Sequence, residues 1–169
     1  MVETAEQYIA RMLGNVGEQN PKAVLESTGR ALRDLVAGQP RSRLTWTSRS
    51  GQWSVVQILA HLADAEIVSA WRLRSILAVD NVPLQAFDQD VWSSAFKYAD
   101  ADPGESLDTF DINRRATLSL LGRVDRIRLE HAGRHEERGR EPIAHLMRLY
   151  AGHDLNHLEQ IGALLKAAP

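Results

Sequence analysis

The feature that most constrains this chain is a long amphipathic segment near its carboxyl end, residues 142–166. At ~100° per residue, its apolar side chains and two of its histidines fall within a sector of roughly 80°. That sector contains Ile143, Leu146, Tyr150, His153, His157, Ile161 and Leu164. Arg148, Glu159 and Lys166 fall on the opposite side. The segment therefore predicts a helix whose apolar face packs against other helices.

His153 and His157 lie in the middle of this face, one helical turn apart, so both are expected to point inward. A buried imidazole without a partner leaves a polar nitrogen unsatisfied, at a cost of ~1–3 kcal/mol. The i, i+4 spacing places the two Cβ atoms about 5–6 Å apart, which lets both rings reach one divalent ion. The alternative is a pair of core histidines satisfied by carbonyls, hydroxyls or a buried water. A metal site requires a third ligand from another segment.

Composition narrows the chemistry available to the chain. Its 169 residues suffice for one domain, residues 1–169, with a substantial core. It has no cysteine, so histidine and carboxylate are its only strong metal ligands, and thiol chemistry requires an external thiol. A formal net charge of −2 argues against a nucleic-acid partner. Because neither a signal peptide nor a run of ~20 apolar residues is found, we expect a cytoplasmic protein with no membrane partner.

Apolar spacing predicts an all-α chain. We expect a short N-terminal helix over residues 4–13 and four longer helices over residues 22–37, 54–79, 105–121 and 142–166. Ser54 and Gln57 form a capping-box pattern at the start of the second long helix. Two long connections, residues 80–104 and 125–140, indicate at least one crossover. No segment alternates convincingly as a strand, so the predicted fold class is an all-α four-helix bundle.

His61 is the strongest candidate for the third metal ligand. It lies at the margin of the apolar face of the second long helix, from which it can reach the interior edge. The competing interpretation is a partly exposed His61 and two satisfied core histidines. His145 lies ~12 Å from His153 along the helix axis and points toward the polar side. His131 and His135 fall in a charged connection, where solvated side chains are expected.

Two motifs resemble signatures of the DinB-like (DinB/YfiT) superfamily. Residues 51–66, GQWSVVQILAHLADAE, resemble its second-helix signature, and residues 150–161, YAGHDLNHLEQI, resemble its fourth-helix signature. Further matches in order and spacing are Phe87-Asp88-Gln89-Asp90, Trp92, Tyr98 and His135-Glu136. The resemblance covers nearly the whole chain. Asn156 departs from the pattern, because similar proteins often carry a further histidine there.

The resemblance implies a four-helix bundle with up-down-down-up topology and long crossover connections, a homodimer, and a divalent ion held by His61, His153 and His157. Zinc and nickel are the expected ions. Three neutral imidazoles leave the +2 charge of such an ion uncompensated and at least one coordination position open.

Two kinds of chemistry suit that open position. A low-molecular-weight thiol would be held there as the nucleophilic thiolate, whereas a bound water, its pKa lowered toward ~7, would supply hydroxide for hydrolysis. Similar proteins include thiol-dependent S-transferases and an isomerase, and this favours thiol transfer to a small-molecule electrophile. A metal-dependent hydrolase and a non-catalytic, stress-related binding bundle are the alternatives.

Several charged residues near the histidines have open roles. Asp64 and Asp154 are placed to orient imidazole N–H groups, although solvent-facing acids are the commoner outcome at such positions. Glu66 lies on the apolar face of its helix. We expect it to form an ion pair with Arg114 or Arg115, with a role as a base near the metal as the alternative.

Three aromatic residues, Trp53, Trp92 and Tyr98, accompany these motifs. Packing in the core is the expected role of their rings, and the lining of a pocket mouth is the alternative.

Overall fold

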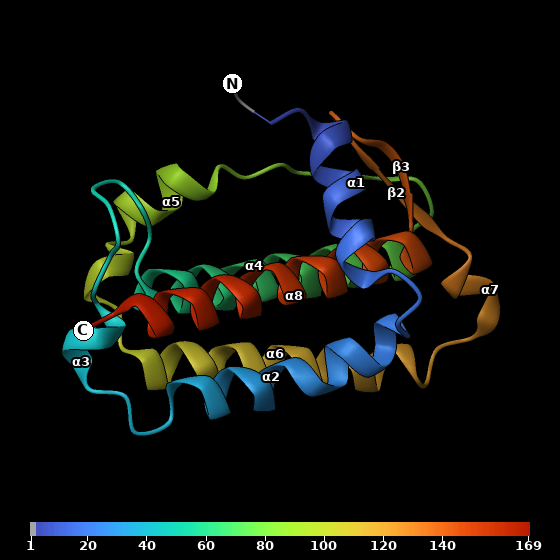
Figure 1. Cartoon of the computed structure of the whole chain (residues 1–169). Helices are drawn as coiled ribbons and strands as arrows, with labels where there is room; N and C mark the ends of the chain where they lie inside the picture. Colours follow the sequence, from blue (N-terminus) through green and yellow to red (C-terminus); the bar gives the residue numbers. More distant parts are fainter. Residues whose placement is uncertain (1–2) are drawn as a thin grey trace.

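The computed structural model describes residues 3–169 and shows a bundle of four long helices (Figure 1). These helices are α2 (Pro21–Val36), α4 (Val55–Ala78), α6 (Pro103–Leu121) and α8 (Ile143–Ala167). α2 and α8 run in one direction and α4 and α6 in the other (Figure 1). α4 packs against α6 and α8, and α2 packs against the same two helices. The predicted four-helix bundle with up-down-down-up topology is confirmed.

Side-chain caps explain where three of these helices begin. Asn20 Oδ1 accepts hydrogen bonds from the first backbone N–H groups of α2. At α4, Ser54 Oγ accepts from the N–H of Gln57, and the Gln57 side chain accepts from the N–H of Ser54, which is the predicted capping box. Asp102 Oδ1 accepts from the N–H of Glu105 at 2.9 Å and starts α6.

A polar layer separates two apolar clusters along the bundle. On α8, Leu146 belongs to one cluster and Ile161 to the other, and both histidines of the predicted site lie between them. On α4, Leu59 and Ile76 mark the same two clusters, and the segment between them carries buried polar side chains. Burying polar groups in mid-bundle is costly unless each finds a partner, so this layer is where a functional site is expected.

The short helix α1 (Ala5–Val16) packs across α8 (Figure 1). The two helices come close together at Gly152, where an added Cβ would lie 1.9 Å from the backbone oxygen of Met12. Only glycine allows this contact, so Gly152 fixes where α1 covers α8. Gly152 is the residue before His153, and α1 therefore passes directly over the predicted site.

The chain also contains three short strands, which the sequence pattern did not indicate. The two long connections carry β1 (Val82–Leu84), β2 (Ala132–His135) and β3 (Gly139–Pro142). They form one sheet in the order β1-β2-β3, with β1 parallel to β2 and β2 antiparallel to β3. The sheet lies at the end of the bundle where α8 begins (Figure 1).

Four short helical segments lie between the long helices. α3 (Arg41–Leu44) lies between α2 and α4, and the other three, α5 (Gln89–Ala95), η1 (Tyr98–Asp100) and α7 (Arg126–Leu129), lie in the two long connections. Over residues 3–169, none of the helices is both long enough and apolar enough to cross a membrane.

Candidate metal centre

Three histidine side chains from two helices meet in the polar layer. His61 projects from the first half of α4, and His153 and His157 project from the middle of α8. The Nε2 atom of His153 lies 3.0 Å from that of His61 and 3.2 Å from that of His157. One ring nitrogen from each residue lies within 4.8 Å of the other two. The structure therefore brings together all three residues that the sequence predicted as ligands.

His61 is buried more deeply than its place in the sequence indicates. The helical pattern puts it at the margin of the apolar face, yet its side chain is only 2% exposed. The reason is Trp53, which precedes the helix and whose ring centroid lies 5.0 Å from that of His61. His157 is 8% exposed, and His153 is partly exposed. The cluster is thus enclosed on the α4 side and accessible at His153.

Burial keeps these imidazoles neutral. The pKa of His61 falls to about 3, chiefly because burial disfavours the charged ring, and His157 adds a smaller repulsion. Burial likewise lowers the pKa of His153 and of His157. A neutral imidazole is the form that binds a metal ion, so all three rings are in the ligand form at neutral pH.

A hydrogen bond from His157 to Gln160 sets the tautomer of the imidazole. The side-chain oxygen Oε1 of Gln160 lies 2.9 Å from His157 Nδ1. Because a carbonyl oxygen only accepts, Nδ1 must carry the proton and donate it, which leaves Nε2 free to bind a metal. The sequence predictions did not include Gln160, although its i, i+3 spacing from His157 was a signal for this contact. His61 Nδ1, by contrast, has no hydrogen-bond partner within the described part of the chain.

The spacing of the three rings suits a single ion. In a tetrahedral site with metal–nitrogen bonds of about 2.0–2.1 Å, two ligand nitrogens lie roughly 3.3 Å apart. The two measured separations, 3.0 and 3.2 Å, are close to that value. Three protein ligands with a fourth position left open are the usual arrangement of a catalytic zinc site.

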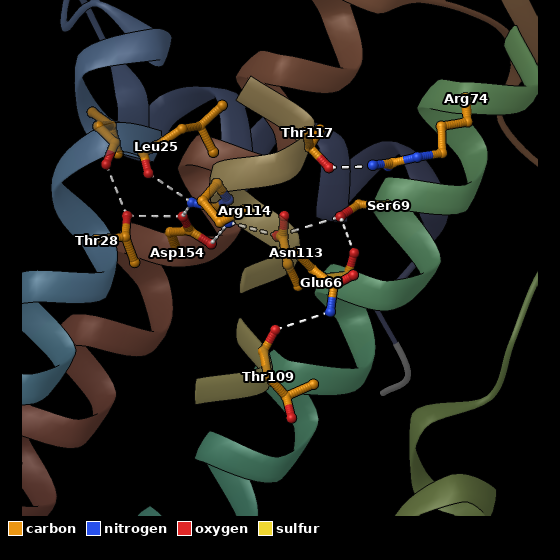
Figure 2. Close-up of polar contacts among 11 residues, drawn as sticks. Leu25, Thr28, Glu66, Ser69, Arg74, Thr109, Asn113, Arg114, Thr117 and Asp154 are labelled. Carbon is orange, nitrogen blue, oxygen red and sulfur yellow. Dashed lines mark hydrogen bonds and ion pairs between the residues drawn. The ribbon is translucent and has the colours of Figure 1, made fainter. Parts of the chain in front are cut away.

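A buried ion-pair network (Figure 2) includes Asp154, the residue that follows His153 on α8. Arg114 of α6 donates to Glu66 Oε2 at 2.8 Å and to Asp154 Oδ2 at 2.7 Å. Asp154 also accepts from Thr28 Oγ1 at 2.8 Å, and Arg114 donates to the backbone oxygen of Leu25 at 3.0 Å. Two carboxylates and one guanidinium leave one formal negative charge, which favours a cation at the neighbouring histidines.

This network settles the roles of the acids near the histidines. The predicted ion pair of Glu66 with Arg114 is confirmed, whereas Arg115 is exposed. Neither role expected for Asp154, orienting an imidazole or facing solvent, is found. Its side chain is buried rather than solvated, and it binds Arg114 instead of an imidazole. Burial raises the pKa of Glu66, which Arg114 opposes.

The aromatic residues have two different surroundings. Tyr98 is buried, as predicted, and its hydroxyl donates to Asp64 Oδ2 at 2.5 Å. That bond corrects both interpretations of Asp64, because the carboxylate neither faces solvent alone nor orients an imidazole. Trp53 lines a cavity beside the histidines. Trp92 packs against Phe87, with ring centroids 4.7 Å apart.

The other three histidines lie outside the cluster. His135 was expected to be solvated but is buried in β2, where its Nδ1 accepts from the N–H of Glu137 at 3.2 Å. His131, also expected to be solvated, is only partly exposed, and its Nδ1 lies 2.9 Å from the backbone oxygen of Ile76. His145 is partly exposed on α8. The strands that bury His135 were not predicted, and this is why its environment was missed.

Two cavities flank the cluster. One, of about 340 Å³, extends from His153 toward Arg72 and Tyr150. The other, of about 660 Å³, is lined by Trp53 and again by His153. Tyr8 of α1 borders both. A small molecule can therefore reach the accessible ring of the cluster from either side.

Asn156, one residue before His157, contacts α1. Its Oδ1 accepts a hydrogen bond from Arg11 of α1 at 2.6 Å, and Arg11 also pairs with Glu3 at 2.8 Å. The side chain lines the larger cavity. Asn156 thus ties α1 to α8 beside the cluster and adds no ligand to it.

Curated relatives match most of the chain. A protein of Oceanobacillus iheyensis named "Putative metal-dependent hydrolase OB0782" is 28% identical over 142 residues, which cover 84% of this chain and 82% of that protein. A Geobacillus kaustophilus protein named "Putative metal-dependent hydrolase GK0616" is 30% identical over 144 residues, covering 80% and 76%.

The fold also matches a solved structure. It is that of YfiT from Bacillus subtilis, described as "a probable metal-dependent hydrolase with an unusual four-helix bundle topology". The TM-score is 0.79 at 23% sequence identity, over 96% of this chain and 88% of that one. Residues 25–161 match the family model of the DinB superfamily. This match spans well over half of the sequence, and the chain therefore belongs to the DinB superfamily.

Proposed function

We propose that this protein is a hydrolase that depends on a divalent metal ion bound by His61, His153 and His157. The observation that carries the proposal is the convergence of three neutral imidazoles, with Nε2 separations of 3.0 and 3.2 Å, beside a cavity. A divalent ion held by three such ligands lowers the pKa of a bound water toward ~7 and so supplies a nucleophile at neutral pH. Zinc and nickel are the proposed ions, because both suit imidazole ligands.

The residues around the cluster prepare it for this role. Gln160 holds His157 in the tautomer that leaves Nε2 free, and Trp53 shields His61 from solvent. The network of Glu66, Arg114 and Asp154 places a formal negative charge next to the ligands. These features favour binding of a cation without adding a fourth protein ligand, so a coordination position stays open for water or substrate.

Hydrolysis replaces the thiol transfer that the sequence alone favoured. The two relatives described above are each named "Putative metal-dependent hydrolase", and this supports hydrolysis. The thiol transferase and the non-catalytic bundle become outcomes of the experiments that follow.

Metal analysis tests the ligand assignment. We expect the purified protein to hold about one zinc or nickel ion per chain, as measured by inductively coupled plasma mass spectrometry. His153→Ala and His157→Ala should lose the ion. His145→Ala is the matched control, because this histidine lies on the same helix outside the cluster, and it should keep the ion. Full occupancy in His153→Ala would refute the assignment.

Turnover tests the reaction class. Chromogenic esters and amides are assayed with and without EDTA, and with zinc or nickel added back. We expect hydrolysis that chelation abolishes, that metal restores and that added thiols do not change. Consumption of monochlorobimane that requires a low-molecular-weight thiol, without any hydrolysis, would favour the transferase instead. A metal-loaded protein that is inert in both assays would identify a binding bundle.

A further inference from the structure

The smaller of the two cavities beside the histidines, of about 340 Å³, contains a buried arginine without a carboxylate partner. Arg72 of α4 is 6% exposed, and its Nη2 donates to the backbone oxygen of Gln85. Its Nε is buried and has no hydrogen-bond partner among residues 3–169. No aspartate or glutamate of that range forms an ion pair with it. A guanidinium removed from water in this way is unfavourable until an anion pairs with it.

A second unpartnered polar group lies beside this arginine. The hydroxyl of Tyr150 on α8 is buried and has no hydrogen-bond partner in the described chain. Burial raises the pKa of Tyr150 to about 12, although Arg72 opposes the shift through its charge and through the approach of its N–H groups to the hydroxyl oxygen. The phenol is therefore protonated at neutral pH and has a proton to donate. Two unused donors facing one cavity are the pattern expected of a site for an acceptor group.

Arg72 and Tyr150 share this cavity with the histidines. Arg72 follows His61 by about three helical turns, which returns it to nearly the same face of α4, ~16 Å further along the axis. Tyr150 precedes His153 by almost one turn on α8. All four residues line the cavity of about 340 Å³. A single small molecule can therefore contact the histidine cluster at one end and the two free donors at the other.

The remaining charges of the cavity wall are paired or exposed. Glu66 and Asp154 both bind Arg114, and Arg138 binds Glu141 at 2.6 Å. The other acids of the wall face solvent, and these are Glu3 and Glu137. No acid of the wall therefore neutralises the buried guanidinium described above.

We infer that the substrate hydrolysed at the histidines carries an anionic group, a carboxylate or a phosphate, and that Arg72 and Tyr150 bind this group. The inference rests on the proposed function for the reacting end of the substrate. The anion site itself depends only on the two donors. A guanidinium can donate two parallel bonds to either oxyanion, and the phenol adds a third donor. The cavity volume lies near the lower end of the range of about 300–1,000 Å³ found for ligand sites, which fits a small molecule.

The Arg72 Nε–H resonance in ¹H–¹⁵N spectra reports on this site directly. Metal-free protein is titrated with glutarate, with inorganic phosphate and with neutral glutaramide, and Arg72→Lys assigns the resonance. We expect at least one of the two anions to shift it saturably and glutaramide to leave it unchanged. The tighter of the two anions identifies the chemistry of the bound group. Absence of a shift with both anions would overturn the inference.

Tyr150→Phe provides a variant whose folding is not in question, since it removes only a hydroxyl that has no partner. It should weaken anion binding roughly five- to tenfold, the usual effect of one lost hydrogen bond. Arg72→Gln should weaken binding by more than tenfold, because it also removes the charge. Arg115→Gln, an exposed arginine, is the matched control and should bind as the wild type does. Equal anion affinities in all four proteins would contradict the site.

Hydrolysis by the zinc-loaded enzyme supplies the second readout. Two p-nitrophenyl esters of similar length are compared, the hemiglutarate and the pentanoate. The wild type should prefer the charged ester, and Arg72→Gln should lose that preference through a higher KM. A shifted Arg72 resonance in a protein that hydrolyses neither ester would support the anion site and refute the proposed function. Equal hydrolysis of the two esters, with no shift of the Arg72 resonance, would support the proposed function and refute the anion site.

Discussion

At the scale of single residues, the cluster depends on side chains that hold the imidazoles rather than on the imidazoles alone. Trp53 covers His61, and Gln160 binds His157 Nδ1 at 2.9 Å. Neighbours of this kind fix the orientation and tautomer of a ligand. Their removal commonly lowers the affinity for the metal by roughly 10- to 100-fold. Of these two neighbours, Gln160 is the easier to remove without disturbing the core.

Gln160→Ala should weaken zinc binding by about tenfold, because His157 is then free to rotate and to exchange tautomers. Gln160 is exposed, so the free energy of unfolding of the metal-free protein should hardly change. Zinc affinity is measured by competition with a chromophoric chelator. Glu159→Ala, at the exposed position just before it, is the control. Equal affinities in the two variants would argue against a role for the Gln160 hydrogen bond.

The buried imidazoles also predict how stability depends on pH. In the metal-free protein His61 has a pKa of about 3 when folded, whereas an unfolded histidine has a pKa of ~6.5. Below pH ~6.5 the unfolded state takes up a proton at His61 that the folded state does not. The contribution of the neutral imidazole to stability is therefore complete above pH ~6.5 and is lost as the pH falls. For one histidine, the free energy of unfolding falls by up to about 1.4 kcal/mol for each pH unit below that value.

Urea unfolding in EDTA, between about pH 7 and pH 5, measures this slope. His61→Gln removes one titrating ring and should show a shallower dependence than the wild type. Arg115→Gln, an exposed substitution that leaves every histidine in place, should keep the dependence of the wild type. Parallel curves for the wild type and His61→Gln would show that His61 is not held neutral by burial.

At the scale of secondary-structure elements, the cluster is built where α4 and α8 meet and where α1 covers them. The position of α1 depends on Gly152, since an added Cβ would collide with the backbone of Met12. The relation of α4, α6 and α8 depends on Arg114, which binds a carboxylate from each of the other two helices. Each contact leads to a prediction.

Gly152→Ala should displace α1 and destabilise the protein by about 1–3 kcal/mol, the usual cost of overpacking. Gly162→Ala is the matched control on the same helix, because an added Cβ there meets nothing within 4 Å. That change should stabilise the helix by roughly 0.5–1 kcal/mol. Urea unfolding measures both effects. A stabilising effect of Gly152→Ala would contradict the close approach of α1 and α8.

Arg114→Met should destabilise the protein by about 3–5 kcal/mol, because it leaves two carboxylates buried without their cation. Arg115→Met, at the exposed neighbouring position, should change the free energy of unfolding by no more than about 0.5 kcal/mol. Urea unfolding at neutral pH measures the difference. Similar losses in both variants would mean that the buried network does not hold the three helices together.

At the scale of the whole molecule, the bundle could be predicted from sequence because its helices are long, periodic and clearly capped. The sheet could not, since its strands span only three or four residues and four helical segments, α5, η1, α6 and α7, separate β1 from β2 along the chain. The histidine cluster could be selected because the spacing of His153 and His157 is a local signal. The surroundings of Asp154 could not, because they depend on how α2, α6 and α8 are placed relative to one another.

The homodimer implied by the family resemblance stays a prediction. Light scattering coupled to size-exclusion chromatography should give twice the mass of one chain. A mass of one chain over the accessible concentration range would show that the protein acts as a monomer.

The central claim is that side chains from two helices hold one metal ion, and X-ray absorption spectroscopy of the zinc-loaded protein at the zinc edge tests it most directly. We predict three imidazole ligands at about 2.0–2.1 Å in the wild type and two in His61→Ala. The same three-imidazole spectrum in His61→Ala, or a wild-type spectrum without imidazole scattering, would contradict this claim.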